Sequence, residues 1–179
     1  MIVNVAGLLH EQPGVSRGYR LRDHYVSLGA PVELAGPLNG FLRLQRTNRS
    51  ILVRGEVSAA VRRSCGRCTD AYVDEARVTI DEEFLPSVDV GTGVPIATRG
   101  EPEETPRINE RHEIDLEPIL RDELALTEPM LGLCSPDCPG LCPGCGRRLD
   151  QGSCSCILDE PDERLAVLAR LLERSAPPD

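Results

Sequence analysis

The chain contains eight cysteines, and their spacing is typical of thiolate coordination to a metal ion. Cys65 and Cys68 form a CxxC pair. A short turn brings two sulfurs within about 4 Å of each other, and two such turns complete a zinc tetrahedron with Zn–S distances of about 2.3 Å. We therefore expect structural zinc. The remaining six cysteines are crowded into one segment: Cys134, Cys138, Cys142, Cys145, Cys154 and Cys156.

Eight thiolates can serve two sites of four ligands each. The group that contains Cys65 and Cys68 would hold the tip of a predicted hairpin to the chain that follows a helix, and so would close a long loop. The other group is local, and its glycines permit the tight backbone of a zinc knuckle. The alternatives are one zinc ion with four spare thiols, an iron–sulfur cluster, a redox CxxC motif, or disulfides. The preferred groups are Cys65, Cys68, Cys134 and Cys138 for one ion, and Cys142, Cys145, Cys154 and Cys156 for the other.

The sequence favours a cytoplasmic protein. Residues 1–5 lack the basic start and long apolar run of a signal peptide. No stretch approaches the roughly 20 apolar residues of a membrane span. Because thiols stay reduced in the cytoplasm, metal binding is favoured there over disulfide formation.

Charge is distributed unevenly along a chain whose formal net charge is −9. Residues 69–129 hold 17 acidic residues against five arginines, a balance of −12, whereas residues 43–68 hold seven arginines against Glu56, a balance of +6. Arginine suits phosphate because it donates two parallel hydrogen bonds, so the basic segment is a candidate RNA-binding surface. The alternative to a binding role is that strands in these segments simply have charged residues on their solvent-exposed faces. The candidate arginines are Arg43, Arg46, Arg49, Arg54, Arg62, Arg63 and Arg67.

Residues 1–85 are expected to be rich in β-structure. The pattern predicts a short strand over residues 2–9 and a hairpin formed by residues 38–45 and 51–61, in which apolar side chains alternate with period two. Residues 71–84 return as another strand, so the CxxC pair lies at the tip of a second hairpin. Residues 86–110 are acidic and contain Pro and Gly, which predicts a mobile linker loop.

Residues 111–179 are expected to hold a helix, the zinc-knuckle cluster and a final helix, and to fold as one domain with residues 1–85. An amphipathic helix is predicted over residues 114–124, with Asp115 as its cap, and another over residues 162–174. The fold class is therefore α+β: an antiparallel β-sheet, open or barrel-like, with two helices and a cysteine-rich zinc-knuckle region. No phosphate-binding glycine loop, GxSxG motif or paired acid–histidine constellation occurs in the sequence, and no catalytic residue is assigned.

Together these features resemble the YceD family, the large ribosomal RNA subunit accumulation proteins. The resemblance spans residues 62–172, and the order of the motifs is specific, whereas the N-terminal strands match only in pattern. One departure is Asp150, where the family typically has asparagine. The matching motifs are Cys65-Gly-Arg-Cys68, Ile114-Asp-Leu116, Leu120-Arg-Asp-Glu-Leu124, Cys138-Pro-Gly-Leu-Cys142-Pro-Gly-Cys145-Gly, Cys154-Ser-Cys156 and Asp162-Glu-Arg-Leu165.

The resemblance implies a role in the accumulation or processing of 23S ribosomal RNA and no established enzyme activity. The partner is then the 23S precursor, contacted directly or indirectly, and the cofactor is zinc, as two structural ions. The sequence is also compatible with two other functions. One is a protein adaptor whose acidic region docks a basic ribosomal or RNA-processing protein. The other is a thiol redox or metal-relay protein.

Overall fold

The computed structural model describes residues 1–96, 105–152 and 154–156. The chain divides into two compact units. The first comprises Met1–Cys65 and Asp70–Cys134, and the second comprises Gly66–Thr69 and the described residues from Ser135 onward. The helix predicted over residues 162–174 lies outside the described residues.

The first unit is built on a six-stranded sheet. Its strands are β2 (Ser16–His24), β3 (Glu33–Leu34), β4 (Leu38–Arg46), β5 (Ile51–Ser64), β6 (Ala71–Pro86) and β7 (Arg107–Ile108). They run in the order β2-β4-β5-β6-β7, with β3 paired to β5. All pairs are antiparallel except β6 with β7, which is parallel. Within the described residues the two edges do not meet, so the sheet is open rather than barrel-like.

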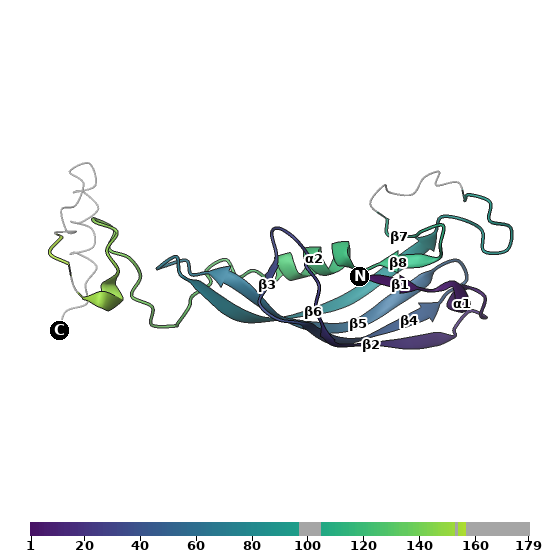
Figure 1. The fold of residues 1–179 in the computed structure, drawn as a ribbon, viewed down its shortest axis with the longest axis horizontal. Coiled ribbons are helices and arrows are strands. Elements are labelled where there is room, and N and C mark those ends of the chain that lie inside the picture. The colour runs from purple at the N-terminus through teal and green to yellow at the C-terminus, as the bar shows by residue number, and fades with distance from the viewer. Residues whose placement is uncertain (97–104, 153, 157–179) are drawn as a thin grey trace, which may run out of the picture. The chain divides into compact units, whose positions relative to one another are not determined.

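One face of this sheet is covered by the remaining elements of the unit (Figure 1). These are α1 (Ala6–Leu9), α2 (Glu117–Leu126) and an antiparallel pair formed by β1 (Ile2–Asn4) and β8 (Glu113–Asp115). Apolar side chains from all four join those of the sheet in one hydrophobic core. This arrangement confirms the α+β class.

Alternation of apolar and polar side chains decides which face of the sheet is buried. In β5 the odd-numbered residues Ile51, Val53, Val57, Ala59 and Val61 are all buried, as the period-two pattern predicts. The apolar partners of these residues, Leu44 in β4 and Ala76, Val78 and Phe84 in β6, are buried as well. The predicted hairpin of residues 38–45 and 51–61 is confirmed. The opposite face of these strands is left to solvent.

The N-terminal strand is shorter than predicted. It ends at Asn4, and the next residues form the single turn α1. The Asn4 side-chain oxygen accepts a hydrogen bond from the Ala6 N–H at 3.1 Å, a local bond that competes with strand pairing. Leu8 and Leu9 are both buried. Successive residues of a strand point to opposite faces, whereas a helical turn puts both leucines into the core.

The helix predicted over residues 114–124 also starts later than expected. Ile114 belongs to β8, and α2 begins at Glu117. Asp115 nevertheless satisfies the helix start, because its Oδ1 accepts the Glu117 N–H at 3.0 Å. The core stripe is confirmed: Leu120 and Leu124 are buried.

Hydrogen bonds hold both ends of the segment 86–110, where a mobile loop is predicted. The Ile96 N–H donates to the Ser87 oxygen at 2.9 Å, and Val88 bridges Pro95. At the other end, β7 pairs with the end of β6. Residues 97–104, at the middle of this segment, lie outside the described residues.

Two glycines allow β4 and β5 to approach closely at the centre of the sheet. A Cβ atom added at Gly55 would lie 2.0 Å from the Phe41 oxygen, and one added at Gly40 would lie 2.3 Å from the Glu56 oxygen. Backbone must therefore move to admit either side chain. We expect Gly55→Ala to lower the free energy of unfolding by about 3 kcal/mol, as measured by denaturant unfolding.

The matched control is Gly36→Ala, whose added methyl meets only the Ala60 Cβ at 3.7 Å. That is an ordinary van der Waals contact, so this variant should stay within about 0.5 kcal/mol of the wild type. Equal stability of the two variants would contradict the close approach of the strands.

Candidate functional site

The first CxxC pair lies where the sequence predicts it, at the tip of the β5–β6 hairpin. β5 ends at Ser64 and β6 begins at Ala71. The Cys65 N–H donates to the Asp70 oxygen at 2.8 Å and closes the turn. Both Cys65 and Cys68 are buried. This turn presents two shielded thiols at the end of a long, regular hairpin.

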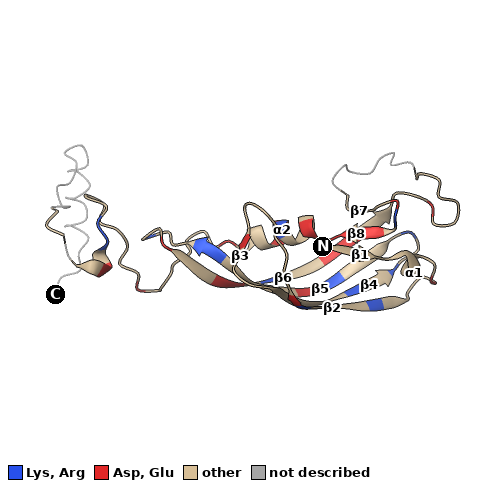
Figure 2. Ribbon diagram, viewed as in Figure 1, with Lys and Arg blue, Asp and Glu red and all other residues tan. Residues whose placement is uncertain are grey.

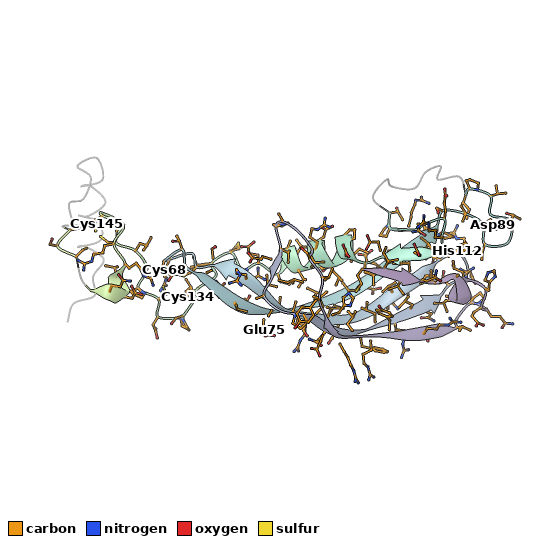
Figure 3. The ribbon with its side chains drawn as sticks, in the orientation of Figure 1. Cys68, Glu75, Asp89, His112, Cys134 and Cys145 are labelled. Atoms are coloured by element: carbon orange, nitrogen blue, oxygen red, sulfur yellow. The ribbon has the colours of Figure 1, made fainter. Side chains whose placement is uncertain are left out.

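The structure brings the eight cysteines together in the two groups preferred from the sequence. Within each group the sulfurs all lie within 4.8 Å of one another. A tetrahedral zinc with bonds of about 2.3 Å holds its sulfurs about 3.8 Å apart. Both groups could therefore hold a metal ion. Figure 3 labels Cys68, Cys134 and Cys145 among their members. The groups are Cys65, Cys68, Cys134 and Cys138, and Cys142, Cys145, Cys154 and Cys156.

Backbone hydrogen bonds fix the segment around Cys138 in the second unit. The Leu141 N–H donates to the Arg67 oxygen at 3.1 Å, and Arg67 Nη1 donates to the Cys138 oxygen at 2.9 Å. Gly140 has a φ of 77°, and a Cβ there would lie 3.0 Å from the Arg67 oxygen. Glycine is required at this position by both its backbone conformation and the close approach.

The second group is built on a small ribbon between residues 140 and 149. The Gly146 N–H donates to the Cys142 oxygen at 2.8 Å, and the Cys142 N–H donates to the Arg147 oxygen at 2.8 Å. Gly146 has a φ of 70°, which reverses the chain directly after the second cysteine of the CxxC motif. The 3₁₀ turn η1 (Leu149–Gln151) then leads toward Cys154. This is the knuckle geometry that the glycines predict.

Two thiols of the second group, those of Cys142 and Cys156, have shifted pKa values. A hydrogen bond from Cys154 Sγ at 3.1 Å, assisted by the N–H groups of Cys145 and Gly144, lowers the pKa of Cys142 to about 6. Hydrogen bonds with Cys145 and then with the other sulfurs raise the pKa of Cys156 to about 12. Thiolates in one cluster repel one another, and a bound cation offsets that repulsion. The donor set is therefore suited to a divalent ion such as zinc.

Figure 2 shows basic residues along β4 and β5. The candidate arginines lie in four environments. Arg43, Arg54 and Arg62 lie on the solvent face of the sheet, at alternate positions of β4 and β5. Arg46 and Arg49 lie at and beside the β4–β5 turn. Arg63 is buried, with its Nε 3.0 Å from Asp74 Oδ2. Arg67 is bonded to the Cys138 oxygen.

The solvent face of the sheet also carries an exposed aromatic ring. Phe41 is 45% exposed, and a Cβ at Gly18 would lie 2.8 Å from its ring. The ring therefore lies over the bare backbone of Gly18. Arg20 is its direct cross-strand neighbour, and Arg43 pairs with Arg54 in the adjacent row of the sheet. Composition and charge counts miss Phe41 and Arg20, although strand alternation would place both outward.

The acidic half of the chain has a different exposed surface. Beyond the buried face of α2, the side chains of Leu126, Met130 and Leu131 are exposed. Glu128 lies among them in the sequence. Exposed apolar side chains beside acidic ones are typical of a protein-docking surface. In the described part of the chain, no helix is long and apolar enough to cross a membrane.

Comparisons with known proteins give a family and several relatives. A family model described as large ribosomal RNA subunit accumulation protein YceD matches residues 53–172. Uncharacterized proteins of Mycobacterium tuberculosis and Mycobacterium bovis are each 33% identical over 108 residues, which is 59% of this chain and 48% of theirs. A Mycobacterium leprae protein is 29% identical over 120 residues, 66% of this chain and 52% of its own. The chain thus spans about half the length of the curated relatives it matches. No solved structure matches it.

Proposed function

Because the chain belongs to the YceD family of large ribosomal RNA subunit accumulation proteins, we propose that it is a non-enzymatic factor that binds the 23S ribosomal RNA precursor and promotes its accumulation or processing. It acts in the cytoplasm, and two structural zinc ions stabilise its cysteine groups. The family name supports the role in ribosomal RNA, and the two four-cysteine groups support the zinc. The family description names an accumulation factor, and no catalytic residue is proposed.

The observation that most strongly supports direct RNA binding is the Arg43–Arg54 pair on the solvent face of the sheet. The two arginines are direct cross-strand partners, and like charges in that position destabilise a sheet. Asp81 balances part of this charge through a 2.8 Å contact with Arg54 Nε. A phosphate group bound by Arg43 and Arg54 would balance the rest, while the exposed Phe41 ring offers a face on which a base can stack.

A second candidate function is supported by the exposed Leu126, Met130 and Leu131. In this alternative the protein is an adaptor that docks a basic ribosomal or RNA-processing protein on its acidic, partly apolar surface. The effect on ribosomal RNA is then indirect. In-cell crosslinking of the tagged protein distinguishes the two, because direct binding yields 23S precursor fragments and the adaptor yields proteins that remain after RNase treatment.

We expect the double substitution Arg43→Gln with Arg54→Gln to reduce crosslinking to 23S precursor and to weaken binding of single-stranded RNA in vitro. Each lost phosphate contact removes about 0.7 from the slope of log affinity against log salt concentration, so two contacts remove about 1.4. The measurement is RNA affinity of the zinc-loaded chain over a series of salt concentrations.

The matched control is Arg17→Gln with Arg111→Gln, which removes the same charge from exposed positions away from this face. If both double variants lose the same amount from the slope of log affinity against log salt concentration, the effect comes from net charge and not from contacts at Arg43 and Arg54. Unchanged affinity in the Arg43 and Arg54 variant, together with protein-only crosslinks, would shift the assignment to the adaptor.

A further inference from the structure

A cleft in the first unit has the composition of a small anion-binding site. It has a volume of about 320 Å³ and lies where the β4–β5 turn meets the end of β6. Such a volume is at the lower end of the range for small-molecule sites. Its arginines are Arg46, Arg49 and Arg107, and its apolar wall includes Leu85, Val88 and Ile96.

The guanidinium of Arg46 contains a hydrogen-bond donor that has no partner among the described residues. Its Nη1 donates to the Ser50 oxygen at 3.1 Å, but its Nε is shielded from solvent and bonds to no described residue. A buried donor without an acceptor costs about 1–3 kcal/mol, so an acceptor is expected there. Arg49 lines the same cleft, and no described carboxylate forms an ion pair with either Arg46 or Arg49.

One acidic residue, Asp89, also lines the cleft, but its carboxylate is already bonded within its own loop. Asp89 Oδ1 accepts the Thr92 N–H at 2.8 Å and the Thr92 hydroxyl at 2.7 Å. Arg46 and Arg49 against this one carboxylate leave the lining with a charge of +1, before Arg107 is counted. Figure 3 labels Asp89 on this loop, which follows β6. The cleft therefore combines excess positive charge with an apolar wall.

We propose that this cleft binds a nucleotide unit, with a phosphate monoester on Arg46 and Arg49 and the base against Val88 and Ile96. Arginine donates paired hydrogen bonds to phosphate, and an apolar wall takes a planar base. Arg107 lines the cleft but is not needed for this assignment. The site is separate from the Arg43–Arg54 pair of the sheet face, and it stands whether or not that face binds RNA. The nucleotide unit is either free or the 5′-phosphorylated end of an RNA.

The first test is calorimetric titration of the zinc-loaded full chain with a mononucleotide, the matching nucleoside and inorganic phosphate. The mononucleotide should bind at least about tenfold more tightly than the nucleoside, the equivalent of one charge-assisted hydrogen bond. Arg49→Gln should abolish that difference, and Arg20→Gln, a matched change on the sheet face, should preserve it. Ile96→Ala should weaken binding of the mononucleotide more than binding of inorganic phosphate. Arg49 and Ile96 are both exposed, so these variants are expected to fold.

The second test compares one short RNA bearing a 5′-phosphate with the same RNA bearing a 5′-hydroxyl. Tighter binding of the phosphorylated RNA that is lost in Arg49→Gln assigns the cleft to RNA ends. Equal binding of both RNAs, with the mononucleotide still bound, assigns it to free nucleotides. Absence of mononucleotide binding at millimolar concentration, or binding that survives Arg49→Gln, overturns the proposal. Loss of RNA affinity in the Arg43 and Arg54 variant with mononucleotide binding intact shows that the two surfaces act independently.

Discussion

Removal of metal by a strong chelator is expected to unfold the second unit while the sheet of the first unit persists. Within the described residues, every member of the hydrophobic core lies between Met1 and Leu124. Among the described residues beyond Cys134, the buried hydrophobic side chains are those of Cys138 and Cys142. Because this described part of the second unit buries so little carbon, we expect coordination to supply most of its stability, and structural zinc supplies about 10–16 kcal/mol in small zinc domains.

Amide hydrogen exchange gives a residue-specific measurement of this effect. The N–H groups of Cys142, Gly146 and Leu149 donate within the ribbon and should be protected in the zinc-loaded chain. After chelation they should exchange at rates typical of unfolded peptide. Amides of β5 and β6 serve as the internal control, because their hydrogen bonds lie in the sheet.

Metal content provides the independent measurement. Native mass spectrometry of the wild type should show two zinc ions per chain, and Cys142→Ser should retain one. Ser155→Ala, between the last two cysteines, is the matched control and should retain both. Iron in the purified protein, or protected amides in a metal-free chain, would contradict the assignment of structural zinc.

Replacing Arg63 with methionine should destabilise the first unit without impairing RNA binding by the folded protein. Arg63 is 8% exposed, and its guanidinium contacts Asp74 in β6 and the Thr127 hydroxyl, at 2.7 Å, just beyond α2. Methionine would leave both partners without their donor. Because Asp74 is partly exposed, the expected loss is about 2 kcal/mol, or about 4–8 °C in Tm.

Arg62→Met is the control for this prediction, one residue away and on the opposite face. Arg62 pairs with Glu33, and both side chains are largely exposed, so this pair contributes about 0–1 kcal/mol. Thermal unfolding should therefore separate the two variants clearly. A stable Arg63→Met protein that no longer binds RNA would instead place Arg63 in the interface.

Arg63 also shows that strand alternation predicts the burial of a side chain better than the density of charge along the chain. The alternation that places Val57, Ala59 and Val61 inside continues to Arg63, so the pattern itself indicates an inward-facing arginine. The density of arginines along the chain does not contain that signal. The second cysteine group, by contrast, follows from local spacing, because its CxxC turn and neighbouring glycines constrain the backbone. The first group joins Cys65 and Cys68 to two cysteines far along the chain, so spacing alone leaves its membership open.

Other features depend on contacts between distant segments and could not be read from spacing. The cleft lined by Arg46 and Arg49 needs residues from the end of β6 and from its following loop. The pairing of β1 with β8 joins residues 2–4 to residues 113–115, which shortens both the predicted N-terminal strand and the predicted helix. Local periodicity predicts that an element exists, whereas such long-range pairing decides where it begins and ends.

The meander of β4, β5 and β6 sets an order of events during synthesis. Each of these strands pairs with its immediate neighbour along the chain, so their contacts close only short loops. The three strands can assemble as soon as Pro86 leaves the ribosome. Cys134 and the later cysteines have then not yet emerged. The hairpin tip therefore presents Cys65 and Cys68 as a finished pair of thiols before the remaining cysteines emerge, and a nascent chain can capture its first metal ion on two ligands.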